Sequence, residues 1–191
     1  MLQSSFARPV GLFDNWFNRF VSFVTQGSFC HSEFIFSWDM DTASRFFEGV
    51  EGYESLKTQY LEHVEDGKVN ICFYVVWGDV CSYRLLKHTN RTAFYRMPNE
   101  VEHKVVELNV GENDEFQLAK FLLSQCGKNY DYSGALASFI PLRRSSTVYD
   151  SYFCSQYMVC GLQHIGRFGN VNPSGVTPNS LYRMLLTTRD V

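Results

Sequence analysis

The sequence predicts an α+β domain in which an antiparallel sheet packs against helices. Three observations lead to this prediction: an amphipathic helix pattern near the start, several strand patterns that follow one another, and helix patterns gathered in the last part. Strands and helices that are segregated along the chain are typical of the α+β class. The 191 residues fit a single domain over 1–191, and a hydrophobic content of 45% is sufficient for a globular core.

The first predicted element is a short amphipathic helix over Asp14–Thr25. Asp14 is a suitable N-cap, and apolar residues recur at helical spacing on one face. These residues are Trp16, Phe17, Phe20, Phe23 and Val24. We expect this face to pack on the sheet, and leave peripheral contact with a membrane, a lipid or a partner as the alternative.

A β-hairpin is predicted next, with a strand over Phe29–Ser37 and a return strand over Ala43–Val50. In the first strand, His31, Glu33 and Ile35 face one way. A regular turn centred between Asp39 and Met40 would place Glu48 opposite His31 on the same face. A bulge would shift this pairing by one residue and turn the partner to the other face.

Three further strands are expected. The stretch 69–77 (VNICFYVVW) is β-branched or aromatic almost throughout, which favours a strand. Gly78-Asp79 is a candidate two-residue turn into a strand over 80–86, and 104–110 is a further strand candidate.

Helices are predicted for the last part of the chain. The first covers Glu112–Cys126, with Asn113 as its cap and Gly127 after its end. The second begins at Cys154, because apolar residues recur at near-helical spacing from Tyr157 to Ile165. A last short helix starts around Pro178.

Composition excludes several function classes. The net charge of −3 gives no general attraction to nucleic acid, and no apolar run approaches the roughly 20 residues that a membrane span needs. The first residues lack the pattern of a secretory signal. The six cysteines are scattered singly, which is typical of free thiols in a reducing compartment, so we expect a cytoplasmic protein.

Cys154 is the candidate nucleophile, because a helix N-terminus stabilises a thiolate through its unbonded amides and its positive dipole end. Nucleophilic catalysis by cysteine also needs a base and a group that orients the base. His31 and, through the predicted hairpin, Glu48 supply these two groups. The backbone amide of Cys154 could also stabilise an oxyanion.

Other chemistry has weaker support in the sequence. Cys160 and His164 share a helix face, but no second ligand pair accompanies them, and structural zinc takes four ligands. Neither a Gly-x-Ser-x-Gly elbow nor a phosphate-binding glycine loop occurs. We therefore expect no metal and no cofactor.

The order of short motifs resembles that of a known superfamily. Gly-Ser-Phe-Cys-His31-Ser is followed by Phe-Glu48-Gly, then by Gly-Lys-Asn-Tyr130-Asp-Tyr, Tyr-Phe-Cys154-Ser-Gln and Val-Thr-Pro-x-x-Leu. This order over roughly residues 14–185 resembles the circularly permuted papain-like cysteine hydrolases of the NlpC type. That superfamily includes bacterial and poxviral proteins, with lecithin–retinol acyltransferase as more distant kin.

The resemblance implies a permuted papain-like fold, with a sheet or half-barrel against helices, and a role for each matched residue. Cys154 matches the nucleophile, His31 the base and Glu48 the residue that orients the base. Tyr130 matches a tyrosine that lines the cleft. Ser155 and Gln156 match a Cys-Ser-Glu-like run and are candidate substrate-binding residues, with Gln156 in place of the usual glutamate. The stretch 78–102 is longer than the family pattern needs and could carry specificity.

Three functions remain open at this stage. The first is a thiol hydrolase, a cysteine peptidase or amidase, that cleaves an amide or peptide bond. The second is acyl transfer or ester hydrolysis on a lipid with the same three residues. The third is a binding or structural protein that keeps the fold without catalysis, for example in a virus particle, since such families also occur in large DNA viruses.

Overall fold

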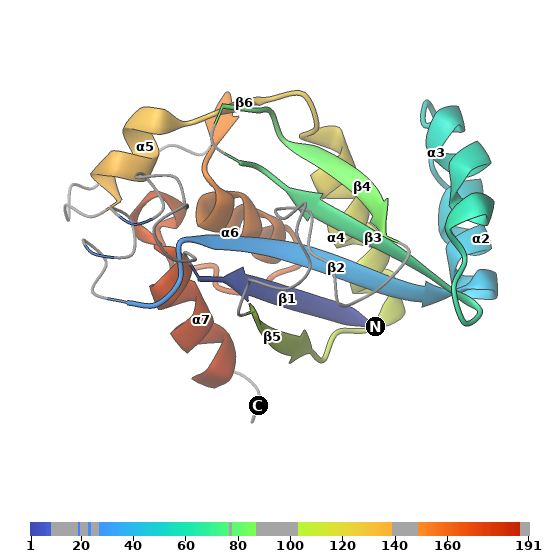
Figure 1. Ribbon diagram of the computed structural model, residues 1–191, viewed down its shortest axis with the longest axis horizontal. Coiled ribbons are helices and arrows are strands. Elements are labelled where there is room, and N and C mark those ends of the chain that lie inside the picture. The colour runs from blue at the N-terminus through green and yellow to red at the C-terminus, as the bar shows by residue number, and fades with distance from the viewer. Residues whose placement is uncertain are drawn as a thin grey trace.

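The computed structural model describes residues 1–8, 19, 23, 27–76, 78–86, 103–138 and 149–187. It is a mixed α+β structure in which one antiparallel sheet packs against helices (Figure 1). This confirms the predicted class. The helix predicted over 14–25 lies almost wholly outside the described residues, as does the second part of the stretch 78–102.

The main sheet has five strands in the order β4-β3-β2-β1-β5, and every neighbouring pair is antiparallel. The strands are β1 (Leu2–Ala7), β2 (His31–Asp39), β3 (Lys68–Tyr74), β4 (Ser82–Leu86) and β5 (His103–Leu108). The long central strand β2 is buried over eight of its nine residues, although one of its two faces carries mostly polar side chains. It carries the candidate base at its first residue.

Strand β1 is an element that we did not predict. It lies between β2 and β5, with Leu2 paired to Phe36 on one side and to Leu108 on the other. Its sequence, LQSSFA, carries two adjacent serines and gives little strand signal. Both serines, Ser4 and Ser5, are nevertheless buried.

The strands predicted over 69–77, 80–86 and 104–110 correspond to β3, β4 and β5, with ends that differ by a few residues. The connection between β3 and β4 is longer than the predicted two-residue turn. Because Tyr74 pairs with Ser82, seven residues lie between the paired positions. Val80, within this connection, bridges to Asn129 instead of joining β4.

The return strand predicted over 43–50 is wrong. Residues Met40–Glu48 form helix α2, with Asp39 as N-cap, whose side chain accepts a 2.7 Å hydrogen bond from the Thr42 amide. Ala43, Phe46 and Phe47 are the buried residues of this helix, and their spacing is helical. The residues interpreted as a hairpin turn are therefore the start of a helix.

Two helices cover the sheet face that carries the large aromatic core. They are α4 (Glu112–Ser124) and α6 (Cys154–His164). Gly161 lets them approach, because a Cβ atom there would lie 2.7 Å from Leu118 Cδ1. This close packing fixes α6, and with it Cys154, against α4 and β2.

The remaining elements lie around this two-layer core. They are α3 (Glu54–Gln59), η1 (Tyr60–His63), β6 (Asn129–Tyr130), α5 (Tyr132–Ala137), β7 (Ser151–Tyr152), η2 (Pro173–Gly175) and α7 (Pro178–Thr187). Strands β6 and β7 form a separate parallel pair with Tyr130 opposite Tyr152. Each strand leads directly into a helix, so the starts of α5 and α6 lie beside each other.

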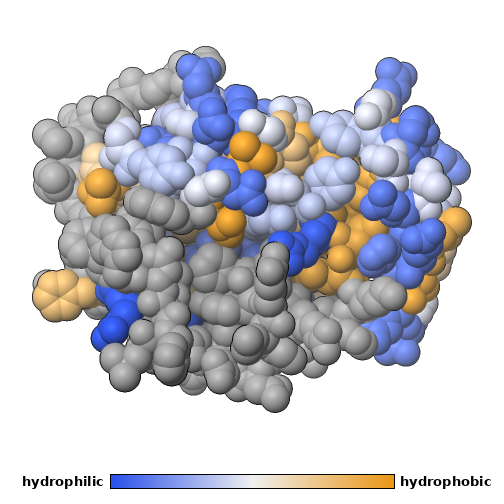
Figure 2. All heavy atoms as spheres, turned by 45° about the horizontal axis from the view of Figure 1, so that its top comes forward, coloured by the Kyte–Doolittle hydropathy of each residue, from blue (hydrophilic) through white to orange (hydrophobic). Residues whose placement is uncertain are grey.

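Figure 2 shows hydrophilic residues along the top and right of one face, with hydrophobic atoms exposed between them. None of the described helices is both long and apolar enough to cross a bilayer.

Candidate functional site

Cys154 is the first residue of α6, as predicted. Phe153 is the N-cap in an extended conformation, and its amide donates a 3.3 Å hydrogen bond to Gln156 Oε1. Phenylalanine offers no side-chain oxygen for capping, so Gln156 caps the Phe153 amide from within the helix. The amides of the first turn, including that of Cys154, therefore face outward from the helix without an intrahelical acceptor.

His31 stands at the first position of β2, where Ala7 of β1 is its register partner. Its imidazole lies within hydrogen-bonding reach of the Cys154 thiol. Both side chains are buried, with exposed fractions of 3% for His31 and 6% for Cys154. The sequence separates these residues by more than a hundred positions, and the packing of α6 on β2 brings them together.

Ser32 adds a second contact to the sulfur atom of Cys154. Strand β3 pairs with β2 only from Phe34 onward, so it ends before it reaches Ser32. In an antiparallel sheet, the amide of Ser32 points to the same side as that of Phe34, away from β1. The Cys154 sulfur lies there and accepts a hydrogen bond from the Ser32 amide.

These contacts shift both titrating groups toward a thiolate–imidazolium pair. Burial alone would lower the pKa of His31, but hydrogen bonds to Cys154 and Glu33 outweigh it and raise the pKa to about 9. Burial alone would raise the pKa of Cys154, yet the contacts with His31 and the Ser32 amide lower it below its usual value. Each group stabilises the charged form of the other.

Three of the other cysteines behave in the opposite way. All six are free thiols. Burial raises the pKa of Cys81, Cys126 and Cys160 to about 12 in each case. Thiols of this kind are inert at neutral pH because the thiolate is the reactive form. Cys154 is therefore set apart by its surroundings and not by burial.

Glu33 lies beside the base. Its Oε2 atom is 3.5 Å from His31 Nε2, and its carboxylate is only 1% exposed. The two residues are two positions apart on β2, so their side chains stand on the same face of the strand. The sequence contained this signal, because the strand alternation already grouped His31 with Glu33.

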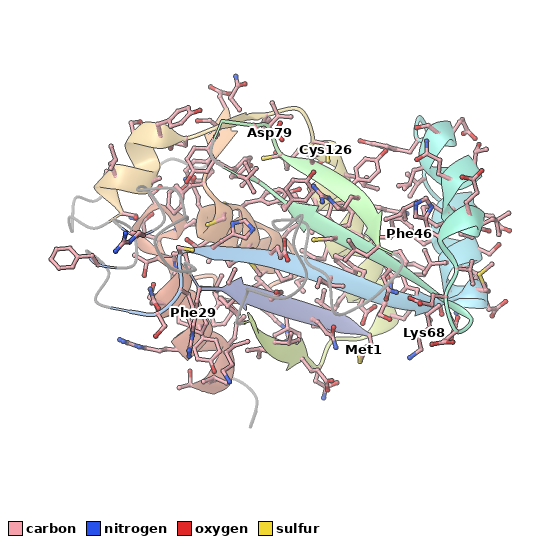
Figure 3. The ribbon with its side chains drawn as sticks, viewed as in Figure 1. Met1, Phe29, Phe46, Lys68, Asp79 and Cys126 are labelled. Carbon is pink, nitrogen blue, oxygen red and sulfur yellow. The ribbon has the colours of Figure 1, made fainter. Side chains whose placement is uncertain are left out.

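Glu48, predicted as the partner of His31, does not occupy that place. It is the last residue of α2 and is exposed to solvent. Because β2 runs about 3.3 Å per residue, its two ends are roughly 25 Å apart. Figure 3 shows Phe29 near the start of β2, and Phe46 and Lys68 at the opposite end. The predicted pairing failed because the hairpin on which it depended is a strand followed by a helix.

Tyr130, for which the family resemblance implies a place in the cleft, lies close to Cys154. It is buried at the end of β6, and the parallel register places it opposite Tyr152, two residues before Cys154. Burial, followed by the negative charge of Cys154, raises the pKa of its phenol well above 10. Tyr130 therefore keeps its proton and remains a hydrogen-bond donor at any physiological pH.

Ser155 and Gln156 were predicted to bind substrate, but their side chains have partners inside the protein. The Ser155 hydroxyl donates a 2.6 Å hydrogen bond to the carbonyl of Val176. Besides its contact with the Phe153 amide, Gln156 donates through Nε2 to Ser174 Oγ at 3.2 Å. Both residues are almost fully buried behind the nucleophile, which corrects their role from substrate binding to positioning of α6.

The described part of the chain contains no group of three His, Cys, Asp or Glu side chains that could hold a metal ion. His164, the metal candidate on α6, stacks instead on the ring of Phe121 at a centroid distance of 4.8 Å. No protein-family model, curated protein or solved structure matches this chain.

Proposed function

We propose that the protein is a thiol hydrolase that cleaves an amide or peptide bond with Cys154 as nucleophile. The observation that carries this proposal is the buried contact between Cys154 and His31, in which the pKa of the thiol is lowered and that of the imidazole is raised. This combination gives a nucleophile that is ionised and a proton donor beside it over the same pH range.

In the acylation step, the Cys154 thiolate attacks the carbonyl carbon of the substrate, and a carbon–sulfur bond forms. The carbonyl π electrons move to its oxygen. When the tetrahedral intermediate collapses, the carbon–nitrogen bond breaks, and His31 gives its proton to the leaving amine. The products of this step are a free amine, a thioester on Cys154 and a neutral His31.

In the deacylation step, neutral His31 removes a proton from water as the water oxygen attacks the thioester carbonyl. The carbon–sulfur bond then breaks, and the carboxylic acid leaves. Cys154 is again a thiolate and His31 is again an imidazolium. Glu33 takes no proton; it holds the imidazole in position and stabilises its charged form.

Two groups are suited to stabilise the oxyanion that forms on the substrate. One is the Cys154 amide, which belongs to the first turn of α6 and has no acceptor within the helix. The other is the Tyr130 hydroxyl, because burial and the Cys154 charge keep its phenol protonated. Its ring is in contact with that of Tyr132, at a centroid distance of 5.1 Å.

The proposal also agrees with the motif order that resembles the permuted papain-like hydrolases. In that pattern the base precedes the nucleophile along the chain, as His31 precedes Cys154. We also propose that the fold is of the permuted papain-like type. In this proposal an antiparallel sheet supplies the base, and the helix packed on the sheet supplies the nucleophile. Glu33 replaces Glu48 as the residue that orients the base.

The test is alkylation of Cys154 by iodoacetamide across pH, with the modified cysteine located by mass spectrometry. We expect Cys154 to react below the usual thiol pKa of about 8.5, and His31→Ala to move its profile to higher pH. Cys126 is an internal control, because it is only partly buried and burial raises its pKa to about 12. An ordinary thiol profile that His31→Ala leaves unchanged would contradict the proposal and favour a non-enzymatic role.

One observation favours the second candidate function, hydrolysis or transfer of an acyl group carried as an ester or thioester. Tyr132 and Leu136 are 43% and 46% exposed on α5, four residues apart and next to Tyr130. An apolar acyl chain could lie against this pair while its carbonyl reaches Cys154.

A comparison of p-nitrophenyl acetate with p-nitrophenyl octanoate tests this second function. If acyl chains bind there, Leu136→Ala lowers the preference for octanoate severalfold. Leu61→Ala is the matched control, because Leu61 is an exposed leucine (57%) on η1, outside the candidate site. An equal effect of the two substitutions would remove the argument for an acyl substrate and leave the amide hydrolase.

A further inference from the structure

A four-residue segment near the end of the chain touches both halves of the candidate site. Val176 accepts the 2.6 Å hydrogen bond from Ser155, the residue after the nucleophile. Asn179, in the first turn of α7, contacts Phe29, two residues before the base. The same short segment therefore holds the helix that carries Cys154 and the backbone that leads to His31.

The contact between Asn179 and Phe29 is a two-point clamp on the backbone. Asn179 Oδ1 accepts from the Phe29 amide at 3.0 Å, and Asn179 Nδ2 donates to the Phe29 carbonyl at 2.9 Å. The side chain of Asn179 thus pairs with one residue as a neighbouring strand would. It is buried, with 6% exposure, and spans a separation of 150 residues. An amide that satisfies both polar groups of one buried residue fixes its position and its orientation.

Two further contacts support the clamp. The ring of Tyr182, one turn further along α7, lies 4.7 Å from that of Phe29, centroid to centroid. Gly27 approaches Asn179 so closely that a Cβ atom there would lie 2.2 Å from Asn179 Cγ. A side chain at position 27 would therefore push Asn179 away from Phe29. The backbone at residues 27–29 therefore leaves space for the side chain of Asn179.

The start of α7 is itself braced. Thr177 and Ser180 cap each other reciprocally: the Thr177 amide donates to Ser180 Oγ at 2.8 Å, and the Ser180 amide donates to Thr177 Oγ1 at 3.2 Å. Pro178 occupies the first helical position, where its missing N–H costs nothing. Asn179 is consequently presented from a rigid turn.

We propose that Asn179 is a positioning residue that sets the contact between Cys154 and His31. It acts through Phe29 on the start of β2, while Val176 fixes the start of α6 through Ser155. This inference rests on the proposed function, since it concerns the same pair. Asn179 itself touches neither reacting atom.

The physical reason is that the interaction between Cys154 and His31 depends on the distance between their side chains. The hydrogen bond and the charge interaction with His31 are what overcome the burial that disfavours the Cys154 thiolate. Both weaken when the start of β2 moves relative to the start of α6, whereas the burial remains. Loss of the clamp should therefore appear as a less acidic thiol.

The experiment measures the pH profile of Cys154 alkylation by iodoacetamide in the full chain carrying Asn179→Ala. We expect its midpoint to move up by about one pH unit, which corresponds to about tenfold less thiolate below the midpoint. Asn179→Ser is the milder variant, and it also serves if the alanine variant does not fold. It keeps a short polar group and should give a smaller shift in the same direction.

Asp39→Ala is the matched control, because it also removes a bond from a side chain to a backbone amide, at the opposite end of β2. It should lower the melting temperature without moving the alkylation profile. If Asn179→Ala and Asn179→Ser lower the melting temperature but leave the profile unchanged, the clamp is only structural and the inference is overturned. That outcome differs from failure of the proposed function, in which the wild-type profile is already that of an ordinary thiol.

Discussion

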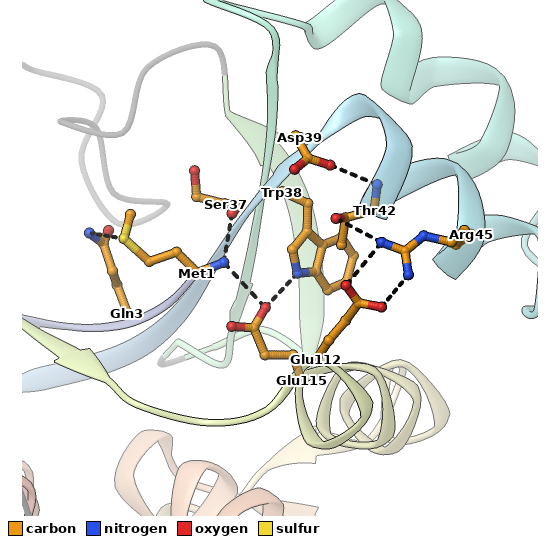
Figure 4. A network of polar contacts seen from close by, with 9 residues as sticks. All are labelled: Met1, Gln3, Ser37, Trp38, Asp39, Thr42, Arg45, Glu112 and Glu115. Atoms are coloured by element: carbon orange, nitrogen blue, oxygen red, sulfur yellow. Dashed lines mark hydrogen bonds and ion pairs between the residues drawn. The ribbon is translucent and has the colours of Figure 1, made fainter.

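The two ends of β2 place their charged side chains in very different surroundings. At the end near Asp39, an ion pair between Arg45 and Glu112 lies at the surface, and the buried carboxylate of Glu115 accepts a 2.7 Å hydrogen bond from Trp38 Nε1 (Figure 4). At the end near His31, a thiol, an imidazole and a carboxylate are buried together.

The two ends of β2 differ in how the surroundings affect the ionisation of their side chains. Around Asp39, the charged side chains of Arg45, Glu112 and Glu115 each have a partner, so these contacts serve the fold. Around His31, burial opposes every charge, and mutual contacts restore a thiolate–imidazolium pair. Because the two sets of contacts lie at opposite ends of β2, substitutions at the two ends should have separable effects.

The largest effect is expected from His31→Gln. Glutamine can neither accept the Cys154 proton nor stabilise the thiolate by its charge, so kcat/KM for hydrolysis of a p-nitrophenyl ester should fall by a factor of about 10² to 10⁴. The measurement is steady-state kinetics at pH 7.5. A variant that retains more than half of the wild-type activity would show that His31 is not the base.

The next largest effect separates the two glutamates. Glu33→Gln should lower kcat/KM about tenfold, because the neutral amide no longer stabilises the imidazolium. Activity should also fall at high pH as His31 loses its proton near its pKa of about 9. Since the Glu33 carboxylate raises that pKa, the substitution should move this fall to lower pH.

Glu48→Gln is the control for this experiment. It removes the same charge from an exposed position at the other end of β2 and should leave both the rate and the pH profile unchanged. Equal effects of the two substitutions would contradict the assignment of Glu33.

A third substitution tests the end of β2 near Asp39. Glu115→Ala leaves the buried Trp38 indole N–H without its acceptor and should reduce the free energy of unfolding by about 2 kcal/mol. The alkylation profile of Cys154 should not move. Denaturant titration gives the first quantity, and a shifted profile would mean that the two ends are coupled.

The smallest effect is expected from Arg45→Ala. Its ion pair with Glu112 lies at the surface, where water and salt screen it. The denaturation midpoint should change less than in Glu115→Ala, and the small change should decrease further in 1 M NaCl. A loss that equals that of Glu115→Ala would indicate a buried network at this end.

Part of the fold and of the candidate site could be predicted from the sequence, and particular residues show which part could not. The helix start at Cys154 and the strands around residues 70 and 105 follow from local periodicity. Glu48 was misplaced because a run such as ASRFFEGV fits a strand and a helix equally well over a short window. The deciding signal was Asp39, which we interpreted as a turn residue although it is a helix cap.

Other features depend on tertiary contacts alone. Nothing local marks residues 2–7 as an internal strand, since that position follows only from pairing with β2 and β5. The role of Asn179 is equally invisible in the sequence, because its partner is the backbone of a residue 150 positions away. Glu33 was the exception: strand alternation had already placed it on the face of His31.

The internal position of β1 has a consequence for how the chain is made. Strand β1 leaves the ribosome about a hundred residues before β5, its partner on one side. At roughly 5–20 residues per second, one edge of β1 waits for about 5–20 seconds without its strand. During that interval the edge can pair with other chains. The yield of folded protein should therefore depend on the rate of translation between residues 8 and 103 and on chaperones that bind β1.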